Sequence, residues 1–447
     1  MTNYPLQSYS AKGITRRDFL WLTTLSIAGF ATGCATNPVT GQKQLMLVSE
    51  SHELDIDQKN SPHQFSADYG VSQDKNLNNY INNTGRNISS HTHRPSIPYS
   101  FRCVNATYVN AYAFPGGSIA VTRGILLSLN SEAQLSALLC HEMGHINARH
   151  TARQMTKGMV TQAIMGGVAI YAGTKDSRYS NLAVQLGMLG AGALLAAYSR
   201  SNEREADSLG LEYMVSAGYT PNGMTELMGV LKRMSKHKPN AIELMFATHP
   251  MSDERYQNTI ESIDQDYKSN LDAPEYRERY MDNTSKLRAI KGAIEAMQKG
   301  EKEMAKQNYV QAEKHFEKGL KQAPLDYTGL VMMAKCQLAL KKPEKALRYS
   351  EKAKKVYPKE AQGHHLSGFA KIKKRKFDSA YEDFRRYDML LPGNPNTTFF
   401  KGLALEGTGK KEQAANMYYR YLQAVNQGEQ AGYSYNKLVK WGYLKQK

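Results

Sequence analysis

The chain contains little cysteine, with 4 residues in 447. This scarcity excludes the small secreted domains that depend on a dense set of disulfides. Acidic residues are also few, with 41 Asp and Glu against 58 Lys and Arg, and the formal net charge is +17. At 41% hydrophobic residues, the chain is too long and too apolar for a disordered tail or a mini-protein, and its length allows two or three domains.

No long apolar run stands at the N-terminus. The run from Phe19 to Ala31 is too short to span a bilayer comfortably, and it follows three basic residues and ends in small ones. Residues 1–33 are therefore a predicted export signal. Thr15–Leu20 resembles the twin-arginine consensus, and Ala31–Cys34 resembles a bacterial lipobox with Ala31 in the usual Leu position. Cys34 is the predicted lipidated first residue, the alternatives being an ordinary cleaved signal or an uncleaved anchor.

Export limits the partners that a positively charged protein surface could bind. Nucleic acid is excluded as a natural partner, which leaves an anionic membrane surface or an acidic protein. A lipid anchor would add membrane affinity without a transmembrane helix. Three cysteines then remain, and we expect Cys103 and Cys140 to be two buried thiols and not a disulfide.

A repeat of 34 residues begins at Gly300. Small residues, alanines and prolines recur at this spacing: Gly300, Ala334, Gly368 and Gly402; Ala312, Ala346, Ala380 and Ala414; Pro324, Pro358 and Pro392. The pattern resembles the tetratricopeptide repeat without its usual tryptophan, and it predicts an all-α solenoid over residues 286–447. From Arg288 onward there are 32 basic and 16 acidic residues, so this region holds +16 of the +17. It is a predicted basic docking surface for a protein partner, or else a solvated face.

Residues 34–285 have a mixed pattern. Tyr99–Val104 alternates like a strand, and Ala111–Val121 suggests two short strands around a Pro-Gly-Gly turn. Ser131, with Gln134 three residues later, predicts a capping box that opens a long helix. The apolar runs 158–172 and 181–197 favour a buried helical hairpin over membrane contact. We therefore expect an α+β fold that is mainly helical with a small β-sheet.

The predicted helix carries the sequence His141-Glu142-Met143-Gly144-His145. Two histidines four residues apart share one helical face, so both imidazoles can bind one zinc ion. Glu142 can then act as general base toward the attacking water. A catalytic zinc needs a third protein ligand, and the residues alone leave Glu203 and Asp207 open. Glu205 points roughly 160° away from Asp207 on a helix and is expected to be a surface charge.

Three segments in order resemble the HtpX/Oma/BepA-type family of zinc metalloendopeptidases. They are His141 to His150, Asn110 to Gly117, and Glu203-x-x-Ala206-Asp207. The resemblance implies a zincin-like fold for residues 34–285, with His141, His145 and Glu203 as zinc ligands and Glu142 as the base. It makes Asp207 the residue that orients a ligand histidine. Members that end in tetratricopeptide repeats behind a signal sequence share this layout.

Further segments suggest how substrate would be handled. Thr248-His249-Pro250 resembles another segment of the family, and His249 would either donate to the oxyanion or bind the open zinc position as a plug. Arg255 would anchor substrate backbone or hold acidic partners in place. The strand that contains Asn110, Ala111, Tyr112 and Ala113 would accept an extended peptide at its edge.

The sequence thus predicts a zinc endopeptidase, exported to the periplasm and lipid-anchored to the outer membrane. The resemblance suggests that it cleaves unfolded or misassembled proteins in outer-membrane quality control, while its repeats bind an envelope protein. The alternative is a chaperone or scaffold whose zinc site is plugged or vestigial. An intramembrane protease is a third hypothesis, against which the shortness of the apolar runs argues.

Overall fold

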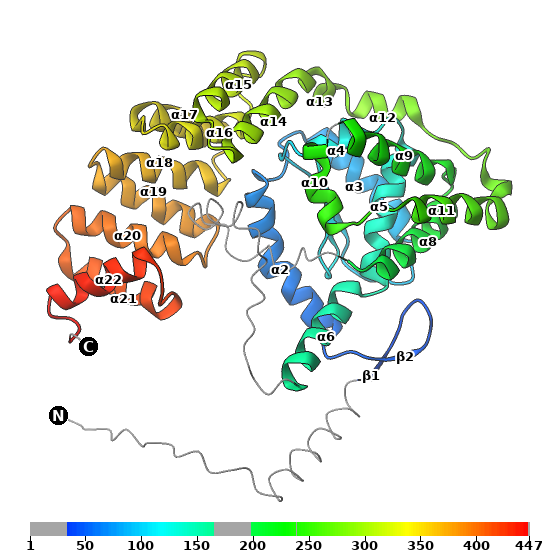
Figure 1. Ribbon diagram of the computed structural model, residues 1–447, viewed down its shortest axis with the longest axis horizontal. Helices are drawn as coiled ribbons and strands as arrows, with labels where there is room; N and C mark the ends of the chain where they lie inside the picture. Colours follow the sequence, from blue (N-terminus) through cyan, green and yellow to red (C-terminus); the bar gives the residue numbers. More distant parts are fainter. Residues whose placement is uncertain (1–33, 165–197, 238, 446–447) are drawn as a thin grey trace, which may run out of the picture.

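The computed structural model describes residues 34–164, 198–237 and 239–445. The predicted export signal and residues 165–197, which hold most of the predicted apolar hairpin, lie outside these ranges. A helical body with a small sheet is followed by an arc of paired helices (Figure 1). Among the described helices, none has the length and apolar character that crossing a membrane requires. The expected α+β body with an all-α repeat domain is confirmed.

The strands lie in the first third of the chain: β1 (Cys34–Thr36), β2 (Lys43–Leu45), β3 (Ser100–Val104), β4 (Ala111–Ala113) and β5 (Ser118–Thr122). β1 pairs antiparallel with β2, and the other three form a sheet in the order β3-β5-β4. β5 runs parallel to β3 and antiparallel to β4. The three predicted strands are confirmed, and Gly117, with φ of 107°, supplies the turn between β4 and β5.

The body contains these helices: α2 (Glu50–Ala67), α3 (Lys75–Ser89), α4 (Arg123–Leu126), α5 (Glu132–Asn147), α6 (His150–Ile164), α8 (Arg200–Ser216), α9 (Asn222–His237), α10 (Pro239–Thr248), α11 (Asp253–Asp266), η1 (Lys268–Asn270), α12 (Arg277–Asn283) and α13 (Ser285–Ala289). Helix α5 is buried along its whole length, with α3, α8, α9 and the sheet packed around it. A helix buried on all sides is normally apolar, so the polar side chains on α5 need partners or a function.

The start of α5 differs in one detail from the predicted capping box. The Ser131 hydroxyl accepts from the Gln134 backbone N–H at 3.2 Å, as expected. The Gln134 side chain, however, accepts from the Asn130 N–H at 2.8 Å and not from that of Ser131. The reciprocal half of the box is therefore shifted by one residue, and the predicted helix start is correct.

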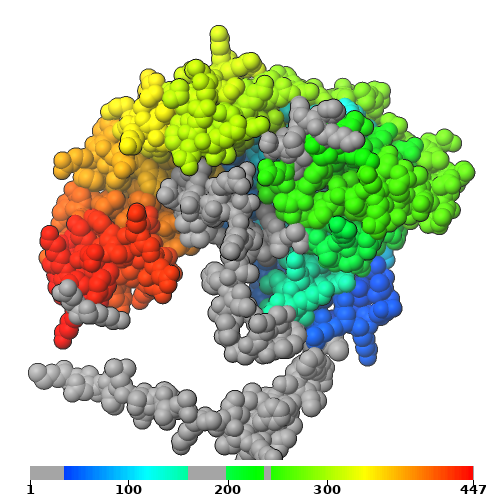
Figure 2. Space-filling view, viewed as in Figure 1, coloured from blue at the N-terminus to red at the C-terminus, as the bar shows by residue number. Residues whose placement is uncertain are grey.

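The repeat domain consists of the helices α14 (Lys291–Ala305), α15 (Tyr309–Gln322), α16 (Tyr327–Ala339), α17 (Pro343–Val356), α18 (Ala361–Lys373), α19 (Phe377–Leu390), α20 (Pro395–Gly407), α21 (Lys411–Ala424) and α22 (Glu429–Lys440). Successive helices pair, and α22 packs on the last pair. Figure 2 shows this part of the chain as an arc that runs from yellow-green to red. The predicted solenoid is confirmed.

The small residues of the repeat have a steric reason. A Cβ atom on Gly300 would lie 2.3 Å from the ring of Phe316 in the partner helix. The same construction on Gly368 meets the Phe384 ring at 2.7 Å. Each glycine thus makes room for an aromatic ring of the paired helix, which is why the small residues and the aromatic residues recur with one period.

The repeat domain packs against the body through buried polar contacts. Arg123, at the start of α4, forms an ion pair with Asp326 at 2.5 Å, and both side chains are at most 6% exposed. Thr328 on α16 donates to the Asn105 carbonyl at 3.0 Å. Gln362 on α18 donates to the carbonyl of Ser66 near the end of α2. The predicted boundary between residues 285 and 286 falls at the start of α13 and stays a prediction.

Three cysteines whose side chains the structure describes are free and buried, namely Cys103, Cys140 and Cys336. Burial raises the pKa of Cys103 to about 12 and that of Cys336 to about 11, so both are neutral thiols near pH 7. The expectation that Cys103 and Cys140 are separate buried thiols agrees with this arrangement.

Candidate metal centre

Four buried side chains converge beside the middle of α5. They are His141, His145, Glu203 and His249, and one ligand atom from each lies within 4.8 Å of the others. The two histidines come from α5, Glu203 from the first turn of α8, and His249 from the end of α10. Nitrogen and carboxylate ligands of this kind are those that bind zinc in proteins. The cluster therefore fits a zinc ion.

The three predicted ligands face one another closely. The Nε2 atoms of His141 and His145 are 3.1 Å apart. Glu203 Oε1 is 3.3 Å from His145 Nε2, and Glu203 Oε2 is 3.5 Å from His141 Nε2. The residues alone left open whether Glu203 or Asp207 is the third ligand. The structure places Glu203 in the cluster and Asp207 behind it, which favours Glu203.

Small residues allow α8 to approach α5 this closely. A Cβ atom on Gly144 would lie 2.9 Å from both the Cα and the carbonyl oxygen of Ala206. One turn further along α8, a Cβ on Gly210 would lie 3.3 Å from the backbone nitrogen of His141. A larger side chain at either glycine would push the helices apart and move Glu203 away from the histidines.

Asp207 contacts the far nitrogen of one ligand. Its Oδ1 is 3.0 Å from His141 Nδ1, so the ring donates there and its Nε2 faces the cluster. Arg255 holds Asp207 with two hydrogen bonds of 2.7 Å and contacts Glu203 Oε2 at 2.6 Å. Arg255 is buried and its guanidinium also donates to the Pro250 carbonyl. Of the two roles predicted for Arg255, the structure favours holding acidic partners over the substrate contact.

Glu142 is placed as a base requires. Its carboxylate is buried, and neither oxygen has a hydrogen-bond partner among the described residues. Burial raises its pKa above the usual range for glutamate. A buried carboxylate without a donor needs a water molecule or a reacting group, and its Oε1 lies 3.7 Å from His249 Nε2 beside the cluster.

The buried groups of the cluster have shifted pKa values. Although burial opposes it, hydrogen bonds with Asp207 and Glu203 raise the pKa of His141 to about 10, so a bound cation would take the place of the proton on its Nε2. Burial lowers the pKa of His145 well below its usual value, so this ring is neutral as a ligand must be. Although burial opposes it, the contacts of Glu203 with His141, His145 and His249 lower its pKa, so this carboxylate is ionised. Two imidazoles and one carboxylate then form the donor set of a gluzincin-type site.

His249 lies inside the cluster and not at its rim. Its Nδ1 is 3.4 Å from His141 Nε2 and 3.2 Å from Glu203 Oε1. The backbone N–H of His249 closes the last turn of α10 onto Met245 at 2.7 Å, and Pro250 follows. The residue thus stands where a fourth ligand would bind.

The predicted substrate strand β4 is the edge of its sheet in the described part of the chain. Asn110 accepts from Thr122, and Phe114 donates to Ser118, so alternation directs the backbone groups of Ala111 and Ala113 away from β5. Ala113 is partly exposed at this edge, whereas Ala111 is buried. The Tyr112 side chain is buried and donates to Asp68. Ala113 also lines a small pocket together with His145 and Tyr198, which brings the end of β4 to the metal centre.

Sequence reasoning missed two residues here and misjudged a third. His150 lies 2.8 Å from His145, and Tyr198 stacks on the His145 ring with 3.8 Å between centroids. Glu205 was expected to be a surface charge, which is wrong because it pairs with His150 at 3.0 Å and with Arg153 at 2.9 Å. The third histidine of the His141–His150 segment was the available signal.

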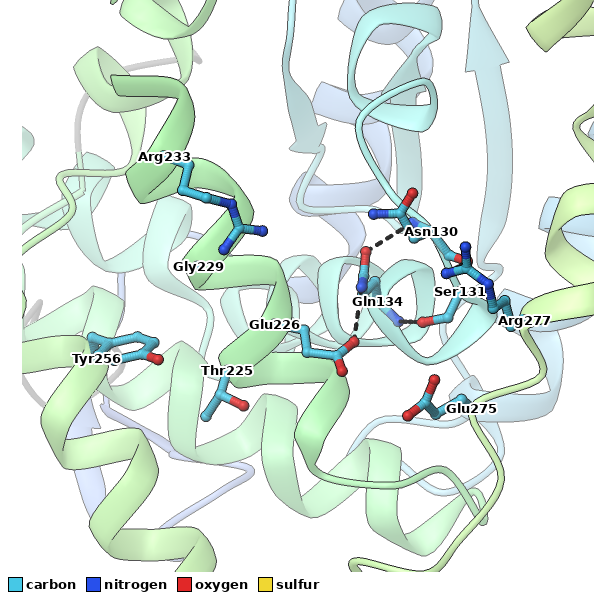
Figure 3. A pocket seen from close by; sticks show the side chains of 10 residues that line it. All are labelled: Asn130, Ser131, Gln134, Thr225, Glu226, Gly229, Arg233, Tyr256, Glu275 and Arg277. Carbon is cyan, nitrogen blue, oxygen red and sulfur yellow. Dashed lines mark hydrogen bonds between the residues drawn. The ribbon is translucent and has the colours of Figure 1, made fainter. Parts of the chain in front are cut away.

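A further pocket lies away from this cluster (Figure 3). It has a volume of about 370 Å³ and opens at the N-terminal end of α5, between α9 and the segment before α12. Its lining is polar and includes Glu226, which accepts from Gln134 at 2.8 Å. No predicted site residue lines this pocket. The candidate site is therefore identified by the converging side chains and not by a cavity.

Comparison with known proteins agrees with this geometry. Residues 75–262 match the model of peptidase family M48. A Vibrio cholerae protein assigned as a beta-barrel assembly-enhancing protease is 31% identical over 202 residues, which cover 43% of this chain and 40% of that protein. The corresponding Escherichia coli protein is 26% identical, covering 40% and 37%. The chain thus spans about two fifths of the length of these relatives.

A shorter relative is matched almost throughout. Metalloprotease LoiP of Escherichia coli is 25% identical over 260 residues, which cover 55% of this chain and 96% of that protein. The residues matched by the family model contain His141, Glu142, His145 and Glu203. Residues 75–262 are therefore similar to peptidase family M48, and this similarity supports a metalloendopeptidase.

Proposed function

We propose that this protein is a zinc-dependent endopeptidase of the bacterial envelope that cleaves unfolded or misassembled proteins. The observation that carries the proposal is the convergence of His141, His145 and Glu203 beside the unpartnered carboxylate of Glu142. Zinc bound by these three ligands would polarise the scissile carbonyl and lower the pKa of the attacking water. Such a site performs hydrolysis of a peptide bond.

The residues around the proposed zinc ion have separate roles in the reaction. Glu142 accepts the proton of the attacking water and later delivers it to the leaving amine, and its raised pKa suits both transfers near neutral pH. Asp207 and Arg255 keep His141 and Glu203 oriented through their hydrogen bonds. The edge of β4, which is partly exposed at Ala113, binds the substrate backbone as an added strand. This mode of binding uses main-chain groups, so it recognises any extended chain and does not depend on a particular sequence.

The proposed location and partners of the protein are argued from Cys34 and from the basic repeat domain. Cys34 would carry the lipid that anchors the protein, with the periplasmic face of the outer membrane as the proposed site. The excess of 16 positive charges beyond residue 287 would bind an envelope protein or an acidic surface there. Relatives named for beta-barrel assembly support a role in quality control of outer-membrane proteins.

The alternative function is a chaperone or scaffold without proteolysis. His249 favours it, because its Nδ1 occupies the place of a fourth ligand and would leave no open position. We regard this arrangement as a self-inhibited state of the peptidase, in which His249 must leave before substrate can bind.

Removal of zinc should test the proposed function directly. The full chain in detergent is incubated with reduced, carboxymethylated α-lactalbumin, before and after treatment with a zinc chelator. Cleavage is expected to fall to background after chelation and to return when one equivalent of zinc is added, because three protein ligands hold one ion. Zinc content is measured in parallel by atomic absorption.

Two results would contradict the proposal. Cleavage that persists in the zinc-free chain would remove zinc from the mechanism. A zinc-loaded chain that binds the unfolded protein without cutting it, even when His249 is replaced, would establish the chaperone hypothesis in its place.

Replacement of His249 by alanine should increase the cleavage rate. If the plugged state holds about 90% of the molecules, removal of the plug raises the rate about tenfold. Zinc content should remain at the parent value, because His141, His145 and Glu203 are still present. A loss of activity with zinc retained would instead assign His249 to the oxyanion.

A further inference from the structure

The metal ligand His145 is tied to a second histidine by its outer nitrogen. His145 Nδ1 lies 2.8 Å from His150 Nδ1, and His150 Nε2 lies 3.0 Å from Glu205 Oε2. Arg153 donates to the same Glu205 oxygen at 2.9 Å. A continuous chain of hydrogen bonds therefore leads from the metal centre through α6 to α8.

The direction of each hydrogen bond follows from the chemistry of neutral imidazole, which has one N–H donor and one acceptor nitrogen. His145 Nε2 faces Glu203 and His141, so its lone pair is directed to the cluster and its proton is on Nδ1. His150 Nδ1 must then accept, which places the His150 proton on Nε2, where it is donated to Glu205. All groups of the chain are satisfied in this single arrangement.

The local backbone is built to bring His150 to this place. Arg149 adopts φ of 55°, a left-handed conformation that reverses the chain between α5 and α6. This costly conformation is held by Arg149 itself, which donates to the Val48 carbonyl at 2.8 Å and pairs with Glu53 at 3.2 Å. As a result the His150 ring is almost fully buried, although it lies only five residues after His145.

A second constraint on the His145 ring is its contact with an aromatic side chain. Tyr198 stacks on its ring at an interplanar angle of 17°, and the Tyr198 hydroxyl is 3.2 Å from Thr151. Stacking fixes the plane of the imidazole and the hydrogen bond to His150 fixes its rotation within that plane. The orientation of His145 is therefore determined before any ion binds.

We propose that His150 is a positioning residue of the metal centre, which orients His145 and sets its tautomer, with Glu205 as the end of the chain. His150 thus serves His145 as Asp207 serves His141. This inference rests on the proposed zinc site and adds to it a residue with no assigned role. It concerns the affinity and geometry of the site, which can be measured without proteolysis.

The test replaces His150 by phenylalanine, which fills a similar volume and cannot accept a hydrogen bond. We expect zinc affinity to fall about 10- to 100-fold, measured by competition with a chromophoric chelator. In the cobalt-loaded chain, the visible absorption bands should shift, because one ligand histidine is no longer held in orientation. His150→Asn should recover part of both losses, since the asparagine Oδ1 stands where Nδ1 accepts.

Three comparisons make the outcome decisive. His91→Phe changes an exposed histidine of the body and should leave affinity and spectrum unchanged. Should His150→Phe fail to fold by circular dichroism, Glu205→Gln and His150→Asn carry the test, and both are expected to weaken zinc binding. Parent affinity and an unchanged cobalt spectrum in the folded variants would overturn the proposal, whereas a parent chain that binds no zinc would overturn the metal centre itself.

Discussion

Replacement of Glu142 by glutamine is expected to slow peptide cleavage by about 10²- to 10⁴-fold, the usual contribution of a general base. Glutamine keeps the size of the side chain but cannot accept the proton of the attacking water. Glu142 is not a member of the converging ligand set, so zinc content should equal that of the parent. The binding of unfolded protein at the edge of β4 should also persist, because it depends on backbone groups.

Initial rates on carboxymethylated α-lactalbumin, with zinc measured in the same samples, provide the check. Glu261→Gln on α11 is a matched control, since this glutamate is exposed and the exchange of acid for amide is the same. A Glu142→Gln chain with more than about a tenth of the parent rate would remove Glu142 from the role of base. If zinc were lost together with activity, the loss of activity would be explained by loss of the metal ion and would not test proton transfer by Glu142.

Replacement of Arg123 by methionine is expected to lower the free energy of unfolding by about 3–5 kcal/mol, because it leaves the Asp326 carboxylate buried without its partner. The ion pair joins α4 of the body to the segment before α16, and both side chains are almost fully buried. Arg123 also donates to the Asn105 carbonyl at 2.9 Å, which adds to the loss. Urea unfolding followed by circular dichroism measures the change.

The double variant Arg123→Met/Asp326→Asn distinguishes this cause from loss of packing. Removing the unpaired charge should recover part of the stability, so the two single effects should not add. In Arg123→Met we also expect the repeats to unfold at lower urea than the body, as a separate transition. A loss below about 1 kcal/mol would show that the contact behaves like an exposed ion pair.

Periodicity predicted the parts of the fold in which each element has its own pattern. The 34-residue spacing located the repeats, because each glycine must accommodate a ring in the partner helix, as Gly300 does for Phe316. Alternation and the Pro-Gly-Gly turn located β4 and β5. The contacts between body and repeats could not be predicted, because Arg123 and Asp326 are about two hundred positions apart and neither belongs to a motif.

The site was predictable where chemistry depends on local spacing. His141 and His145 share a helix face at any tertiary arrangement, and their motif also marks Glu142. The third ligand needed the family resemblance, because Glu203 and Asp207 are equally plausible until α8 is placed against α5. His150 was missed because its contact depends on the left-handed turn at Arg149, which helix periodicity cannot reveal.

The contact between Gly144 and Ala206 limits how this protein can diverge. A side chain at position 144 would collide with the backbone of Ala206, and no substitution at position 206 removes a backbone atom. Gly144 can therefore change only if α8 moves away from α5, and that movement would separate Glu203 from His141 and His145. As long as the cluster keeps this geometry, position 144 accepts only glycine.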